Sequence, residues 1–149
     1  MKTLYQKEVV DEIINRVNKL SPNTQHQWGK MSVEQMLAHC SVGMQTATGE
    51  KFLQSGFFLK LIGPLFKSQT TNDKPFRKES PTHPGFIIGS TEGFGKEKQK
   101  MVGLINKFHQ GGEAKCTTNP HSFFGKLTPK EWSSLMYKHL DHHLRQFGV

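Results

Sequence analysis

The chain has 149 residues, a formal net charge of +8 and 11 phenylalanines. This length suits one domain with a single core, and the phenylalanine content excludes an intrinsically disordered chain. Cys40 and Cys116 lack the spacing of a disulfide framework or a cysteine zinc site. No apolar signal core follows Met1, so we expect a reducing, cytoplasmic location.

The first two expected helices are recognised by their apolar spacing and by their ends. Residues 7–20 carry apolar side chains at helical spacing, and Pro22 follows the end of this helix. The second helix opens at Ser32, where the hydroxyl of Ser32 and the side chain of Gln35 form a capping box. It is expected to run to about Thr46.

The middle of the chain is less regular. The apolar segment Phe52–Phe66 is interrupted by Lys60 and is too short to span a bilayer. It predicts a short helix that packs over the other helices or across a dimer interface. Residues 67–90 contain three prolines and predict a long loop of the kind that often forms a functional lid. Residues 86–88, Phe-Ile-Ile, are the one weak strand candidate.

Two further helices are expected in the second half. Residues 92–109 have helical apolar spacing and are followed by Gly111 and Gly112. The last helix starts at residues 128–131, Thr-Pro-Lys-Glu, which combine a capping box with proline at the first helical position, and it ends at Gly148. Four helices with almost no alternating pattern predict an all-α fold. We expect one four-helix-bundle domain over residues 1–149, with a long loop and a short extra helix between helices two and three.

Histidines are concentrated in the last helix. His139 and His143 lie four residues apart, so both imidazoles fall on one face, near the middle of the apolar stripe. Buried imidazoles need partners, and two of them with Gln146 one turn on resemble half of a metal site. The alternative is a hydrogen-bonded pair in the core, or an effect of helix-terminal charge. His142 lies at the border of the stripe.

A third ligand is available on the second helix. A catalytic site of the zinc type needs about three protein ligands and an open position. His39 lies toward the edge of the apolar stripe of that helix, and Gly43, one turn later, leaves space for a metal or substrate. Cys40 points about 100° away from His39 and is expected in the core.

Several polar residues have simpler expected roles. Asp141 is expected to point outward and to pair with Lys138 or Arg145 at little energetic value. Gln146 is expected either to support the metal site or to be the last polar contact of the bundle. Three further histidines are expected at the surface: His26, His83 and His109.

Two stretches of the chain resemble the DinB-like superfamily of metal-binding four-helix bundles. The first is residues 28–40, which include Trp28 and His39. The second is residues 123–148, which contain the pattern His139-x-x-x-His143-x-x-Gln146. The closest branch is a bacterial family called domain of unknown function 1569. The resemblance implies a divalent metal, zinc or nickel, bound by His39, His139 and His143. It also implies thiol transferase or thiol-dependent isomerase activity with a small thiol, and a homodimer. One departure from the branch is Ser122, where proline is common.

The expected function is a metal-dependent thiol transferase or hydrolase. Three neutral imidazoles would hold a divalent metal that activates a small thiol or water toward an electrophilic small-molecule substrate. The alternative is a non-enzymatic bundle that binds a small molecule or serves a stress response, with the metal structural or absent. Nucleic-acid binding is not expected, because the basic residues are scattered without interleaved aromatics. A membrane partner is not expected either.

Overall fold

The computed structural model describes residues 1–54, 62–72, 74–80 and 82–149. Over these ranges the chain is helical and contains no strand. The described α-helices are α1 (Lys7–Asn18), α2 (Val33–Thr48), α4 (Phe94–Gly111) and α5 (Pro129–Gln146). Short 3-10 turns lie between them: η1 (Gly63–Thr70), η2 (Pro84–Phe86) and η3 (Glu113–Lys115). The all-α class predicted from the sequence is therefore confirmed.

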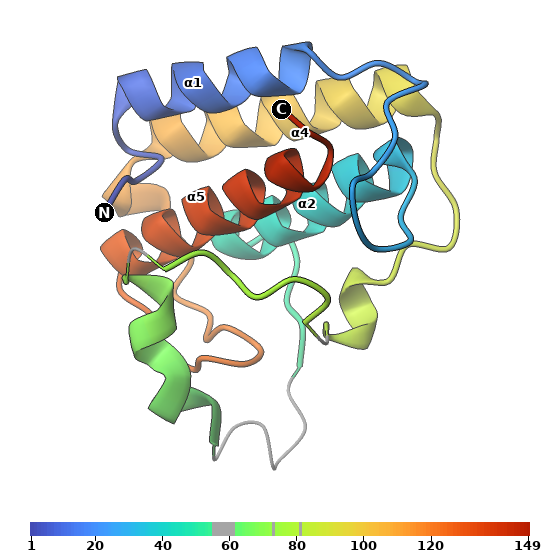
Figure 1. Ribbon diagram of the computed structural model, residues 1–149. Helices are drawn as coiled ribbons and strands as arrows, with labels where there is room; N and C mark the ends of the chain where they lie inside the picture. The colour runs from blue at the N-terminus through green and yellow to red at the C-terminus, as the bar shows by residue number, and fades with distance from the viewer. Residues whose placement is uncertain (55–61, 73, 81) are drawn as a thin grey trace.

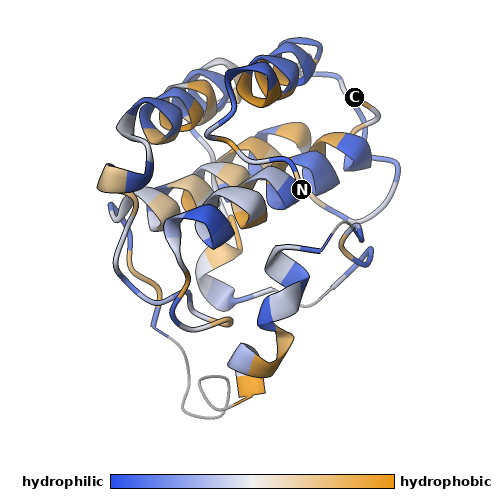
Figure 2. Cartoon of the chain, turned by 90° about the vertical axis from the view of Figure 1, so that its left-hand side faces the viewer, coloured by the Kyte–Doolittle hydropathy of each residue, from blue (hydrophilic) through white to orange (hydrophobic). Residues whose placement is uncertain are grey.

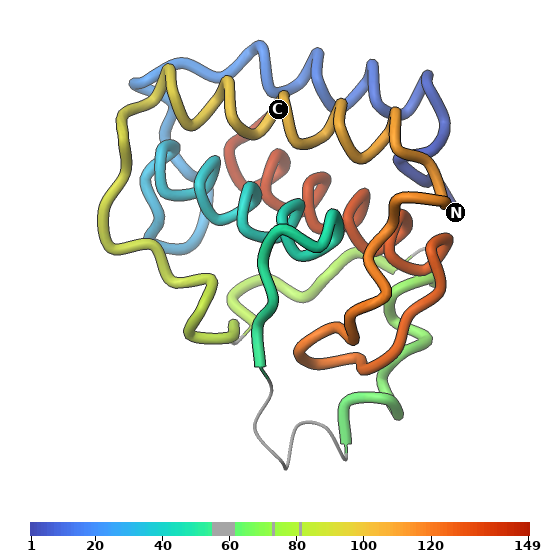
Figure 3. The backbone as a smooth tube through the Cα atoms, turned by 180° about the vertical axis from the view of Figure 1, so that it is seen from behind, coloured from blue at the N-terminus to red at the C-terminus, as the bar shows by residue number. Residues whose placement is uncertain are grey.

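The four α-helices pack side by side, with α1 and α4 on one side and α2 and α5 on the other (Figure 1). Helix α2 contacts both α4 and α5, and α1 contacts the same two helices. The apolar stripes of the helices meet in one core, and the hydrophilic residues of α1 and α4 lie mostly on the faces turned away from it (Figure 2). Helices α2 and α5 run in opposite directions, as the view from behind also shows (Figure 3).

Both predicted capping boxes are present. At α2 the hydroxyl of Ser32 accepts from the Gln35 amide at 3.2 Å, and the Gln35 side chain accepts from the Ser32 amide at 3.0 Å. Thr128 and Glu131 make the same reciprocal pair at α5. Helix α2 continues two residues beyond the predicted end, because Gly49 at φ 79° supplies the left-handed cap.

The strand candidate at residues 86–88 is wrong. Residues Pro84–Phe86 form the 3-10 turn η2, and the Nδ1 atom of His83 accepts from the Gly85 amide at 3.0 Å. Proline fixes the backbone at the start of the turn, and no strand lies beside Phe86 in the described ranges to form a ladder with it. The β-branched isoleucines therefore had no partner that would turn local preference into a sheet.

The expected short helix at Phe52–Phe66 lies partly outside the described residues, since 55–61 are not among them. Its described end enters η1, so the expected long loop from residue 67 begins inside a 3-10 helix. Gly63 is required there, because a Cβ atom would lie 1.6 Å from the carbonyl oxygen of Phe123. No helix among the described residues is long and apolar enough to cross a membrane.

Lys138, which was expected as a partner of Asp141, is buried. This lysine is 7% exposed, and its ammonium donates to the carbonyl oxygens of Gln69 (2.6 Å) and Asn72 (3.0 Å) and to the Asn72 side chain (2.9 Å). The ring of Phe76 lies 4.8 Å away. Residues of η1 and of the segment after it thus cover a second side of α5, a contact that helical spacing alone does not reveal.

Asp141 is also less exposed than predicted. It pairs with Arg145 at 2.9 Å as expected, but its closer partner is Arg16 of α1, at 2.7 Å. The side chains of Asp141 and Arg16 are 14% and 15% exposed. The ion pair therefore joins α1 to α5 and is largely buried, rather than exposed at the surface.

Candidate metal centre

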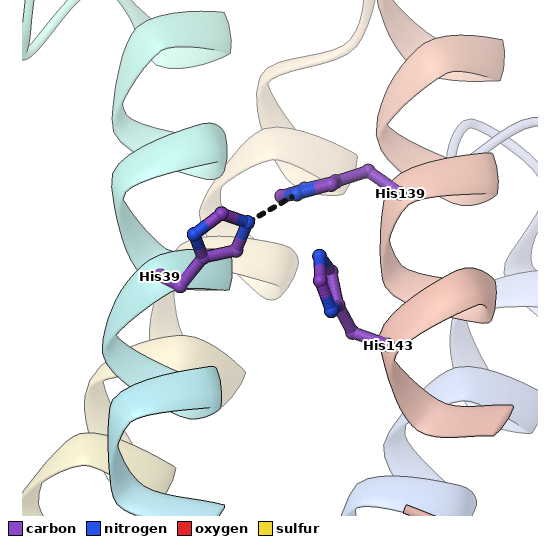
Figure 4. Close-up of side chains that lie close together, drawn as sticks. All are labelled: His39, His139 and His143. Atoms are coloured by element: carbon purple, nitrogen blue, oxygen red, sulfur yellow. Dashed lines mark hydrogen bonds between the residues drawn. The ribbon is translucent and has the colours of Figure 1, made fainter. Parts of the chain in front are cut away.

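Helices α2 and α5 bring His39, His139 and His143 together (Figure 4). Each offers one ring nitrogen, and these three nitrogens all lie within 4.8 Å of one another. The Nε2 atoms of His39 and His139 are 2.9 Å apart, and the ring centroids are separated by 4.6 to 4.9 Å. All three residues singled out from the sequence thus form one cluster, and their role as metal ligands stays a prediction.

The cluster is more deeply buried than the sequence indicated for His39. His39 and His143 are 5% and 8% exposed, so His39 does not lie at an edge open to solvent. Burial and then the neighbouring His39 lower the pKa of His143 to about 3, and burial lowers the pKa of His39. Burial, followed by His143 and His39, holds the pKa of His139 well below its usual range. The imidazoles are therefore neutral near pH 7, which is the protonation state that binds metals.

A chain of two hydrogen bonds fixes the ring of His143. Its Nδ1 donates to the side-chain oxygen of Gln146 at 2.8 Å, and the amide nitrogen of Gln146 donates to the carbonyl oxygen of Trp28 at 2.7 Å. The proton on Nδ1 leaves Nε2 with a free lone pair. Gly29 makes room for this arrangement, since a Cβ atom there would lie 2.5 Å from the Gln146 nitrogen. Gln146 thus contacts both His143 and the Trp28 carbonyl, and its support of a metal site stays a prediction.

A backbone carbonyl fixes the ring of His39 in the same way. Its Nδ1 donates to the carbonyl oxygen of Phe86 at 3.0 Å, which leaves Nε2 as the nitrogen that faces His139. The Phe86 ring packs against His39 and His139, with centroids 5.3 and 6.1 Å away. These contacts of Phe86 were not predicted from the sequence, where the turn made by Pro84 and Gly85 before it was the only signal.

The expected free space at Gly43 is taken by a ligand candidate. A Cβ atom on Gly43 would lie 3.0 Å from Nδ1 of His139 and 3.1 Å from its Cε1. Gly43 therefore makes room for the ring of His139 rather than for a substrate. The expectation of free space beside Gly43 is therefore corrected. The sequence could not show this, because only the packing of α5 on α2 determines which group lies there.

The other histidines lie outside the three-nitrogen group. His142 is half-buried, with its ring centroid 5.0 Å from that of His143 and 5.9 Å from Trp28. His26 is exposed as expected. His83 and His109 are only partly exposed, and each holds a backbone carbonyl at 2.9 Å, so both have structural partners that the sequence did not indicate.

The cluster fits a divalent metal ion. Two ligands each about 2.0–2.1 Å from a tetrahedral zinc lie roughly 3.4 Å apart, within the range spanned by these nitrogens. All three donors are neutral, and two of them are oriented by hydrogen bonds from the opposite ring nitrogen, as in known metal sites. The three histidines could therefore hold a metal, although their chemistry alone does not select one element.

A family model described as "Protein of unknown function (DUF1569)" matches residues 4–148. No curated protein and no solved structure matches the chain. The family description assigns no activity, so any function must be argued from the cluster.

Proposed function

Since the chain belongs to the DUF1569 family of proteins of unknown function, we propose its activity from the histidine cluster: a metal-dependent enzyme of the DinB-like type. The reaction class is transfer of a small thiol, or of water, to an electrophilic small molecule. One observation carries the proposal. Three neutral imidazoles from two helices converge within 4.8 Å in a buried site. Hydrogen bonds from Nδ1 of His39 and of His143 leave an Nε2 lone pair on each of these two rings.

His39, His139 and His143 would hold a divalent metal, zinc or nickel, in this reaction. When bound, the metal supplies Lewis acidity, which lowers the pKa of a thiol or water. The protein groups have separate tasks. Gln146 keeps His143 in one tautomer, the Phe86 carbonyl does the same for His39, and the Phe86 ring shields the imidazoles from water.

The cysteines of the chain favour an external thiol. Cys40 is fully buried in the core, as the sequence predicted, and burial raises the pKa of its thiol. Burial also raises the pKa of Cys116. Neither residue has the exposed, low-pKa thiol of a catalytic cysteine, so the nucleophile in this proposal is a low-molecular-weight thiol of the cytoplasm, where such thiols stay reduced.

The proposal includes a homodimer. Phe52, Leu65 and Phe66 are 51%, 80% and 43% exposed, and they lie in the apolar segment expected to pack against another surface. Sedimentation equilibrium of the purified protein tests this part. A monomer at all concentrations would contradict it.

The first experiment is elemental analysis of the purified protein beside a His39→Ala/His143→Ala double variant. We expect one divalent metal per chain in the parent and none in the double variant. His142→Ala is the matched control, because this neighbouring histidine lies outside the three-nitrogen group. Circular dichroism confirms that each variant keeps its helices.

The second experiment measures activity. The metal-loaded parent is incubated with a small thiol and an electrophile such as a haloarene, and thiol consumption is followed. Turnover that disappears in the double variant but persists in His142→Ala supports the proposal. Full metal occupancy without turnover for any thiol or for water would favour the binding-module alternative, and full occupancy in the double variant would contradict the site.

A further inference from the structure

A small pocket lies beside the contact between α2 and α5, away from the histidine cluster. Thr46 of α2 and Trp132 of α5 line it, together with residues 51–53 and 119–122. Thr46 follows His39 by seven residues, and Trp132 precedes His139 by seven. Because the helices are antiparallel, both spacings place the pocket about 10.5 Å, or two helical turns, from the histidine cluster along the contact between α2 and α5.

Trp132 brings an unpaired donor to this pocket. Its side chain is 1% exposed, and its Nε1 atom has no hydrogen-bond partner among the described residues. An indole N–H can only donate. A buried donor without an acceptor costs about 1–3 kcal/mol, so such a group in a pocket wall calls for an acceptor from outside the chain.

His121 offers a second donor in the same wall. Its Nδ1 accepts from the backbone amides of Phe123 (3.0 Å) and Phe124 (3.2 Å), so the proton of the neutral ring lies on Nε2. The ring packs on Trp132 at a centroid distance of 5.2 Å, so the two rings that carry these donors are in contact. Burial lowers the pKa of His121 to about 4, and the ring is therefore neutral near pH 7.

The charges around the pocket favour an anion. None of the lining residues is acidic, and Lys51 supplies an ammonium group. The interior admits about one water-sized group, such as a single oxygen atom at the end of a larger molecule. An oxyanion could accept from the N–H groups of Trp132 and His121 and from the Lys51 ammonium.

We infer that this pocket binds the carboxylate end of a small molecule, with the Trp132 indole N–H, the His121 Nε2–H and the Lys51 ammonium as its donors. This site needs no metal.

The test follows the two indole N–H signals of the nitrogen-15-labelled protein by NMR, and Trp28→Phe assigns them. Acetate is titrated at constant ionic strength, with acetamide as the uncharged probe of the same shape. We expect a saturable downfield shift of the Trp132 proton with acetate, a dissociation constant in the millimolar range, and little change with acetamide or at Trp28. His121→Phe and Lys51→Gln should each weaken acetate binding about fivefold or more.

Three outcomes would overturn the inference: no saturable shift, an equal response to acetamide, or acetate affinity unchanged in both His121→Phe and Lys51→Gln. The titration is repeated on the His39→Ala/His143→Ala variant. The same shift there shows that the carboxylate site stands even if the proposed metal chemistry fails. Trp132→Phe keeps the ring without the donor, and loss of thermal stabilisation by acetate in this variant gives an independent check.

Discussion

Helix α5 buries polar groups on two faces, and the two faces differ in the charge of these groups and in the partners that they find within the chain. Toward α1 and η1, Asp141 and Lys138 are charged and surrounded by partners: Arg16 binds the carboxylate, and three oxygen atoms bind the ammonium. Toward α2, His139 and His143 face His39 as neutral rings without a carboxylate in the cluster. One face is complete within the chain, whereas on the other the Nε2 lone pairs of His39 and His143 are suited to a cation from outside.

The largest expected effect comes from the face with the histidine cluster: the free energy of unfolding of the metal-free protein should fall as the pH is lowered. The folded-state pKa of each cluster imidazole is lowered from an unfolded value of about 6.5. The unfolded chain therefore binds more protons below that pH. The stabilisation is complete above about pH 6.5 and is lost as the pH falls toward the folded pKa, by about 1.4 kcal/mol per pH unit for each ring that stays neutral.

Urea unfolding of chelator-treated protein between about pH 7 and pH 5 measures this loss. His143→Gln should flatten the profile, while His26→Gln, at an exposed position, should leave it unchanged. A free energy of unfolding that does not vary with pH in the parent protein would show that the cluster is not held neutral.

The next effect concerns the support of His143. Gln146→Ala removes the acceptor at 2.8 Å, so His143 loses its fixed tautomer. We expect zinc affinity to fall about 10–100-fold, measured by competition with a chromophoric chelator. Gln99→Ala, exposed on α4, is the control. Equal affinities in all three proteins would reduce Gln146 to a structural contact with Trp28.

Substitutions on the face toward α1 and η1 should change the free energy of unfolding and leave zinc affinity unchanged. Lys138→Met leaves the oxygens of Gln69 and Asn72 without their donor, and we expect a loss of about 1–3 kcal/mol in the free energy of unfolding. Lys130→Met, exposed on the same helix, should change it by less than about 0.5 kcal/mol. A change in zinc affinity of the folded Lys138→Met protein would mean that the two faces are coupled.

The smallest effect separates two helical glycines. Gly103→Ala on α4 meets no atom within 4 Å and should raise stability by about 0.4–1 kcal/mol, because alanine restricts the unfolded chain. Gly43→Ala should lack this gain, since its Cβ would press on His139 at 3.0 Å. Thermal unfolding of both variants measures the difference. An equal gain at both positions would show that His139 has room to move.

The helices of this protein were largely readable from local patterns. Both capping boxes and the pairing of His139 with His143 depend on residues three or four positions apart, so the sequence contains them directly. The strand candidate at residues 86–88 failed for the complementary reason. Its outcome depended on a neighbouring strand, and the described structure supplies η2 and a histidine there instead.

The sequence by itself determined the helical class and nominated three histidines, because helical periodicity places side chains on a known face. Only the tertiary structure decided that their nitrogens converge, that Gly43 admits His139, and that Phe86 and Gln146 orient the rings. It also decided that Lys138 is buried and that Trp132 and His121 share a pocket wall. These contacts join residues far apart in the chain, and their formation depends on how the helices pack rather than on any local preference.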